Sequence, residues 1–160
     1  MPPFEIEDLK SLKEYEGREF PATDWFMVSE ERIQKFAEAT EDFQWIHMDD
    51  ERARRETPFG GAIAQGFLTL SLLSYFVKQA VQIRTGVAMT INYGLNKVRF
   101  PSPMRSGSKV RARVTLLSAK ESPRFVDVTF LVQVESQSAD GQAPTKPNCV
   151  AEWLVRYYAK

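Results

Sequence analysis

Residues 36–74 decide how this chain folds and where its chemistry lies; they read FAEATEDFQWIHMDDERARRETPFGGAIAQGFLTLSLLS. Asp42 stands five residues before His47, which is the only histidine among the 160 residues. A glycine-rich turn follows, and a long apolar segment then begins at Gly66. A carboxylate and an imidazole can move protons, and the first amides of a helix can bind an anion. The stretch therefore predicts an acid–base site beside a helix N-terminus.

The composition is that of an ordinary globular domain. Hydrophobic residues make up 43% of the chain and charged residues 26%, and the length suits one domain with its own core. We therefore expect a single domain over residues 1–160. The 21 basic and 21 acidic residues balance, so we expect neither nucleic acid nor a membrane as a partner.

Cysteine usage and the distribution of apolar residues bear on the compartment. The single cysteine, Cys149, cannot form an internal disulfide, and charges interrupt the N-terminal residues, unlike a secretion signal. The longest uncharged apolar run, from Gly66 to Val77, is too short to cross a bilayer. These features favour a cytoplasmic protein. One histidine and no cysteine cluster also argue against a metal site, so none is expected.

The apolar segment from Gly66 predicts a long central helix that ends near Ile83. Its apolar side chains point in all directions around the helix, so such a helix should be buried on every side. The preceding residues predict, in order, a short helix (7–16), a short strand (24–28), a helix capped by Ser29 that ends near Thr40, a loop (41–48) and a second short helix that stops before Pro58.

The C-terminal half of the chain predicts an antiparallel sheet. In most of its segments apolar and polar residues alternate with a period of two, as in strands with one buried and one wet face. The four predicted strands cover residues 88–100, 109–117, 125–135 and 148–158, and Gly94 is a candidate bend in the first. A curved sheet wrapped around a buried helix gives an α+β fold. Its open edge and remaining apolar groups favour a homodimer or higher homo-oligomer.

Three segments together resemble the MaoC-like (R)-specific enoyl-CoA hydratases. FAEATEDFQWIH is similar to the family pattern Phe-Ala-x-x-(Thr/Ser)-Gly-Asp-Phe-x-x-x-His, FGGAIAQGFLTLSLLS to its loop and central helix, and NYGLNKVRFPSPMRSGSKVRARV to the strands that follow. The letters QWIH resemble the nodulation-protein-N-like branch. The resemblance implies a hotdog fold, in which a curved antiparallel sheet wraps one long central helix. Gln65 departs from the pattern, because many members have histidine there.

The resemblance also implies roles for residues. The catalytic pair falls on Asp42 and His47, and the oxyanion donor is the backbone N–H of Gly66. The implied reaction is the reversible syn addition of water to a trans-2-enoyl-CoA, giving an (R)-3-hydroxyacyl-CoA, with no cofactor because coenzyme A is part of the substrate. Further candidates for substrate binding are Trp45 and Ser74 for the acyl group, and Lys97 and Arg99 for the phosphates.

Two other functions remain open at this point. Other hotdog proteins are acyl-CoA thioesterases, which place a catalytic carboxylate on or next to the central helix; residues 66–83 contain none. The second alternative is a non-catalytic acyl-CoA-binding subunit, although both Asp42 and His47 are present. Each single residue also has an ordinary explanation: Asp42 as a turn residue, and Ser74 as a core serine bonded to its own helix backbone.

Overall fold

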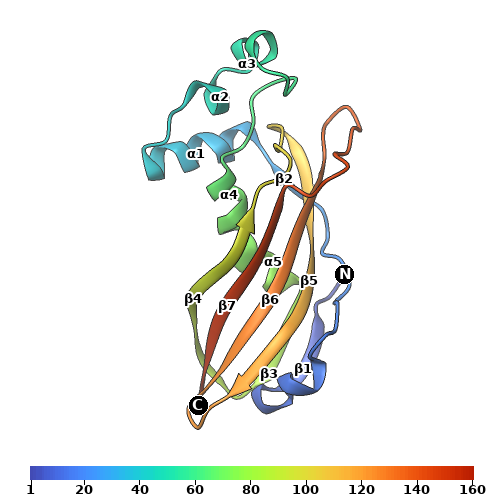
Figure 1. Ribbon diagram of the computed structural model, residues 1–160, viewed down its shortest axis with the longest axis vertical. Helices are drawn as coiled ribbons and strands as arrows, with labels where there is room; N and C mark the ends of the chain where they lie inside the picture. The colour runs from blue at the N-terminus through green and yellow to red at the C-terminus, as the bar shows by residue number, and fades with distance from the viewer.

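The computed structural model describes all 160 residues. A five-stranded antiparallel sheet, in the order β2-β5-β6-β7-β4, curls around the helix pair α4–α5, and the parallel pair β1–β3 lies at one end (Figure 1). The strands are β1 (Phe4–Asp8), β2 (Phe26–Val28), β3 (Val81–Thr85), β4 (Val87–Arg99), β5 (Ser108–Glu121), β6 (Phe125–Gln137) and β7 (Cys149–Ala159). The α+β fold class predicted from the sequence is confirmed.

The helices form two groups. α1 (Glu30–Thr40), α2 (Trp45–Met48) and α3 (Asp50–Glu56) cover the end of the sheet opposite the chain's C-terminus, whereas α4 (Gly66–Ser71) and α5 (Leu73–Ala80) lie against its concave face (Figure 1). A 3-10 helix, η1 (Leu9–Tyr15), follows β1. None of these helices is long and apolar enough to cross a membrane.

The core lies between the helix pair and the sheet. Because side chains alternate along a strand, every second residue of β5, β6 and β7 points inward. These apolar side chains pack against Leu68, Leu73, Phe76 and Val77 of the helices in one buried cluster. Phe76 and Phe130 are its largest fully buried members. The alternation read from the sequence is thus the alternation of the buried sheet face.

The predicted single helix over residues 66–83 is wrong in two respects. An irregular residue, Leu72, separates α4 from α5, and the helical part ends at Ala80. Val81 and Ile83 instead enter β3, where they pair in parallel with Phe4 and Ile6 of β1. β-Branched residues favour strands when a partner is available, and the N-terminal residues supply that partner.

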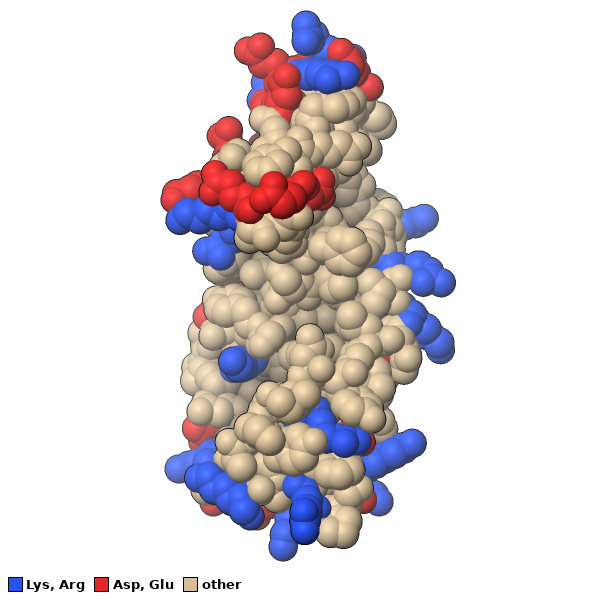
Figure 2. Space-filling model, turned by 90° about the vertical axis from the view of Figure 1, so that its left-hand side faces the viewer, with Lys and Arg blue, Asp and Glu red and all other residues tan.

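The predicted burial of this helix on every side is also wrong for the single chain. Phe67 is 71% exposed and Tyr75 is 40% exposed. Strand β4 adds further exposed apolar side chains at the sheet edge: Met89, Ile91, Tyr93 and Leu95. Figure 2, which looks at this side of the molecule, shows a broad band with few charges below the charged region over α1–α3.

The first half of the chain follows the prediction in part. Ser29 caps α1 by accepting a hydrogen bond from the Arg32 N–H, and α1 ends at Thr40 as expected. Residues 7–16 are not an α-helix, because they divide between β1 and η1; Asp8 caps η1 by accepting from the N–H of Ser11. Residues 45–48 of the predicted loop form the short helix α2. The predicted bend at Gly94 is a shift in the β4–β7 register.

Candidate active site

Asp42 is held at the end of α1 by the local conformation of the chain. Glu41 closes the helix in the left-handed conformation, with φ of 62°. This turns the chain sharply, and the N–H of Gln44 then lies 3.4 Å from Oδ1 of Asp42. The Asp42 side chain stays 45% exposed. Its second oxygen, Oδ2, is therefore free to face the next element, α2.

His47 lies in α2, and its side chain is only 8% exposed. Its Nδ1 is 2.7 Å from the carbonyl oxygen of Ile63. Because a carbonyl oxygen can only accept a hydrogen bond, we assign the ring proton to Nδ1. In the neutral imidazole, Nε2 then carries the lone pair. The N–H of Ile63 in turn donates to the carbonyl of Ile46 at 3.0 Å, so α2 and residue 63 bind each other twice.

The acid and the imidazole face each other across a short gap. Nε2 of His47 lies 3.8 Å from Oδ2 of Asp42, which is too long for a direct hydrogen bond. With a neutral imidazole, both atoms are hydrogen-bond acceptors. A water molecule carries two donor hydrogens and can bridge two such acceptors. The pair can therefore orient one water and take a proton from it, which is the action of a general base.

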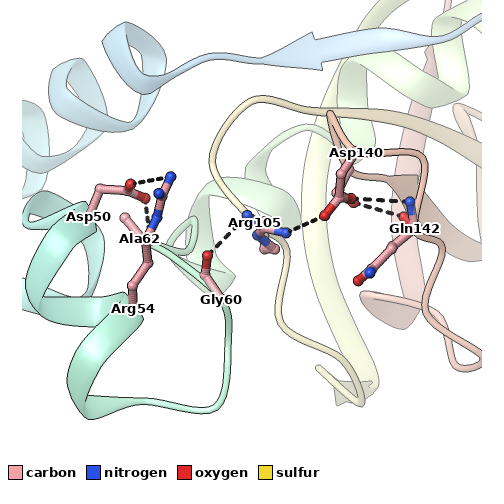
Figure 3. Close-up of polar contacts among 8 residues, drawn as sticks. Asp50, Arg54, Gly60, Ala62, Arg105, Asp140 and Gln142 are labelled. Atoms are coloured by element: carbon pink, nitrogen blue, oxygen red, sulfur yellow. Dashed lines mark hydrogen bonds and ion pairs between the residues drawn. The ribbon is translucent and has the colours of Figure 1, made fainter.

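The turn that leads to Ile63, from Gly60 to Ala62, is held by side chains on two sides (Figure 3). On one side, Oδ1 of Asp50 accepts from the N–H of Ala62 at 2.9 Å, and Oδ2 pairs with Arg54 at 2.8 Å. On the other, Arg105 donates to the Gly60 carbonyl at 3.0 Å and pairs with Asp140 at 3.1 Å. These contacts fix the turn that precedes Ile63.

Gly61 is required by this clamp. Its φ is +156°, and a Cβ at this position would lie 2.6 Å from Oδ1 of Asp50. Two backbone bonds to the β4–β5 connection complete the arrangement: the Ala64 N–H donates to the Met104 carbonyl and the Ser106 N–H to the Ala62 carbonyl, both at 2.8 Å. The turn is thus a rigid support for His47.

Gln65 ties this segment to the helix that leads to Asp42. Its side chain is 2% exposed, and Nε2 donates to the carbonyl of Ile33 in α1 at 3.3 Å. Its Oε1 is buried without a hydrogen-bond partner in the chain. Gln65 also precedes the first turn of α4, whose Leu68 and Thr69 N–H groups donate to its backbone carbonyl. One residue therefore contacts both α1 and α4.

Gly66 is the first residue of α4, and its N–H donates to no group of the chain. An unpaired N–H at a helix start can bind a negatively charged oxygen. A Cβ on Gly66 would lie 3.4 Å from three ring atoms of Phe100. The absence of a side chain at this position therefore lets Phe100 pack closely against the helix start.

The other predicted site residues lie around this centre. The Trp45 ring packs under the guanidinium of Arg52, 3.9 Å from the ring centre. Lys97 and Arg99 are exposed on β4; Lys97 has φ of 51°, and Arg99 donates to the neighbouring Val98 carbonyl. Neither cation is brought to the Asp42–His47 pair by a hydrogen bond or ion pair.

Ser74 lies on α5 and lines two adjoining cavities, of about 370 and 250 Å³, between the helix pair and the sheet. It is not bonded to its own helix backbone; Ser71 is, since its Oγ donates to the Leu68 carbonyl at 2.7 Å. The ordinary explanation considered for Ser74 is therefore wrong.

Sequence reasoning missed the residues that support the pair. Asp50 reads as an ordinary acidic residue in the first turn of a helix, and Arg105 as one of several cations after β4. The Ile63 carbonyl is a backbone group, which leaves no signal in side-chain patterns. Two adjacent glycines, Gly60 and Gly61, were the one sign that this turn is tightly constrained.

A curled antiparallel sheet around a central helix, with an acid and an imidazole beside the helix start, defines a hotdog-type protein. Solved structures share this fold. The chain superposes on a MaoC-like dehydratase from Rhodospirillum rubrum with a TM-score of 0.67 at 23% identity, covering 91% of this chain and 93% of that one. It also superposes on an (R)-hydratase from A. caviae involved in PHA biosynthesis, with a TM-score of 0.62 at 22% identity, covering 87% and 93% of the two chains. The predicted hotdog fold is confirmed.

Sequence comparison is more specific. Residues 12–138 match the model of the MaoC like domain family. The chain is 44% identical over 155 residues to 3-hydroxyacyl-thioester dehydratase Z of Mycobacterium tuberculosis, covering 96% of this chain and 98% of that protein. It is 39% identical over 139 residues to Nodulation protein N of Rhizobium leguminosarum bv. viciae, covering 87% and 84%. The protein belongs to the MaoC-like domain family, and the predicted family and branch are confirmed.

Proposed function

We propose that the protein is an (R)-specific enoyl-CoA hydratase/dehydratase, a hydro-lyase that adds water to trans-2-enoyl-CoA and removes it from (R)-3-hydroxyacyl-CoA. The observation that carries the proposal is the 3.8 Å gap between Oδ2 of Asp42 and Nε2 of His47, which suits one water held by two acceptors. The relative named 3-hydroxyacyl-thioester dehydratase Z supports the same reaction class.

In the hydration direction, Asp42 takes a proton from this water as its oxygen bonds to the β-carbon of the enoyl group. The electrons of the double bond move onto the thioester oxygen. The free N–H of Gly66, at the positive end of α4, stabilises that developing charge. The α-carbon then takes a proton from the Asp42–His47 pair on the same face, so that one water has been added in the syn sense. The residues need no cofactor for these steps.

The remaining binding roles are part of the proposal. Ser74 lines the cavity between the helix pair and the sheet, which would hold the acyl group. Lys97 and Arg99 provide positive charge for the phosphates of coenzyme A. Trp45, on α2, borders the site. The exposed apolar side chains of Met89, Ile91 and Tyr93 on β4 support a homodimer, since an open sheet edge of this kind is normally covered. We propose that the protein acts in the cytoplasm, in fatty acid metabolism.

The test is turnover of crotonyl-CoA, followed by the loss of enoyl thioester absorbance, with the configuration of the product determined. Asp42→Asn and His47→Gln should each lower kcat by about 10²–10⁴-fold, the usual contribution of general acid–base catalysis. Glu38→Gln, an exposed carboxylate change on α1, is the matched control. Release of free coenzyme A thiol would instead indicate thioesterase activity. Tight acyl-CoA binding without turnover of any chain length would indicate a non-catalytic subunit.

A further inference from the structure

A groove runs along the helix pair from Phe67 in α4 to Lys78 near the end of α5. Phe67, Leu70, Ser71 and Ser74 lie at helical spacing and line its first cavity; Ser74, Val77 and Lys78 continue the same stripe into the second. The opposite wall descends β4 through Leu95, Asn92, Thr90 and Val87. Ser74 and Trp153 line both cavities, so the two cavities adjoin.

The groove begins next to the proposed oxyanion donor in the sequence. Phe67, in its wall, directly follows Gly66, the proposed oxyanion donor. A thioester whose oxygen meets the Gly66 N–H therefore has the start of the groove within one helical turn. The acyl chain of the substrate is the part that can continue along it.

Several polar groups in the first part of the wall have hydrogen-bond partners within the chain, although the Ser74 hydroxyl has none. The Ser71 hydroxyl donates to the Leu68 carbonyl at 2.7 Å. Trp153 Nε1 donates to Asn92 Oδ1 at 2.7 Å, which also holds the indole in place. These polar groups already have partners and do not have to be hydrated. Deeper in the groove, the walls include the side chains of Leu12, Val77, Ile83 and Phe130.

The length of the groove points to a long ligand. From Phe67 to Lys78 the helix pair is roughly 16 Å long at the rise of an α-helix. An extended chain advances about 1.2 Å per single bond, as a polypeptide backbone does, so about ten to fourteen carbons span this length. The polar side chains Lys78, Gln82 and Thr90 gather at the second cavity and mark the end of the apolar run. A four-carbon acyl group fills only its beginning.

We propose that the preferred substrates carry acyl chains of about ten to fourteen carbons, with the chain lying between α4–α5 and β4 and its far end beside Thr90 and Tyr157. This inference rests on the proposed hydratase function for its substrate class. The groove itself can be tested without turnover, because a saturated acyl-CoA binds but cannot be hydrated.

The first experiment is calorimetric titration of the full chain with butyryl-, octanoyl- and dodecanoyl-CoA. Each fully buried methylene is worth roughly fourfold in affinity. Dodecanoyl-CoA should therefore bind about tenfold more tightly than butyryl-CoA, or better, even with incomplete burial. Equal affinity for the three ligands would overturn the inference.

The second experiment locates the chain. Thr90→Phe places a ring in the second cavity from an exposed position of β4, and phenylalanine is well tolerated in strands. The variant should lower the affinity for dodecanoyl-CoA about tenfold or more and the affinity for butyryl-CoA much less. Gln133→Phe, at an exposed position of β6, is the matched control. Unchanged dodecanoyl-CoA affinity in Thr90→Phe would place the chain elsewhere and overturn the inference.

Turnover separates the two proposals. The ratio of kcat/KM for 2-dodecenoyl-CoA to that for crotonyl-CoA should exceed one, and Thr90→Phe should lower it. A ratio below one in the wild type would overturn the inference while leaving the hydratase in place. If no enoyl-CoA is turned over but affinity still rises with chain length, the hydratase proposal fails and the groove assignment stands.

Discussion

Nδ1 of His47 lies 2.7 Å from the carbonyl oxygen of Ile63, sixteen residues along the chain. This contact assigns the proton of the buried imidazole to Nδ1 and leaves Nε2 to face Asp42. The proposed catalytic geometry therefore depends on a backbone carbonyl, and that carbonyl depends on the turn at Gly60 and Gly61. Substitutions that disturb this turn should therefore lower kcat, even though they lie outside the acid–imidazole pair.

Asp50 is the first such position. Asp50→Ala removes the acceptor for the Ala62 N–H and the partner of Arg54, so the turn that carries the Ile63 carbonyl loses one of its supports. We expect kcat for crotonyl-CoA to fall by about tenfold or more, because small misplacements of reacting groups are costly. Asp50→Asn keeps an acceptor oxygen and should retain most activity. Glu51→Ala, at the next and exposed residue of α3, is the control; equal kcat in Asp50→Ala and Glu51→Ala would contradict the proposed support.

Gly66 allows a direct test of the oxyanion donor. Proline is favoured at the first position of a helix, and Gln65 already has the extended conformation, φ −62° and ψ 136°, that suits a residue before proline. Gly66→Pro therefore removes the N–H while the helix start is kept. We expect a loss of about 10²–10³-fold in kcat.

Gly66→Ala is the matched variant, because it keeps the N–H and adds only a methyl group 3.4 Å from the Phe100 ring. Circular dichroism and the melting temperature should show both variants folded. If the alanine and proline variants lose activity equally, crowding against Phe100 explains the effect, and the amide is not the oxyanion donor.

The sequence predicts the parts of this protein that repeat a pattern. Alternation along residues 109–117 and 125–135 identified the strands and their buried faces, and the Ser29 cap fixed the start of α1. The spacing of Asp42, His47 and Gly66 suggested the site. The supports of that site are contacts between segments, such as Arg105 with Gly60, and no local pattern encodes them. The end of the central helix was misjudged for the same reason, because β1 is the distant partner that converts Val81 and Ile83 to a strand.

The backbone conformation of Glu41 suggests a stabilising substitution next to Asp42. Its φ of 62° lies in the left-handed region, which costs a residue with a Cβ about 1–2 kcal/mol and glycine little. The family pattern has glycine at this position. Glu41→Gly should raise the free energy of unfolding by about 0.5–1 kcal/mol and the melting temperature by about 1–4 °C.

Glu41→Gln is the matched control for that change, since it removes the charge but keeps the backbone strain. Its melting temperature should stay close to that of the wild type. A glutamine variant as stable as the glycine variant would attribute the gain to the lost charge near Asp42 rather than to the backbone.

The buried thiol of Cys149 should make the stability of the fold fall at alkaline pH. Burial raises the pKa of its thiol from 9.0 to about 11. Between these two pH values the unfolded chain has lost the thiol proton while the folded chain keeps it. Because the folded state then binds more protons, the free energy of unfolding falls as the pH rises. At pH 10 this loss is about 1 kcal/mol, or about 2–4 °C in melting temperature. Burial also raises the pKa of Tyr157, which adds a loss of the same sign.

The measurement is the difference in melting temperature between pH 7 and pH 10, compared within each variant. Cys149→Ala lowers stability at both pH values, because it leaves a small cavity at a fully buried position. Its drop between the two pH values should nevertheless be smaller than in the wild type, since the group that titrates is gone. The drop in Tyr157→Phe should shrink in the same way. If the drop is identical in Cys149→Ala and the wild type, the thiol does not ionise on unfolding in this range, and the alkaline loss of stability has to come from other groups.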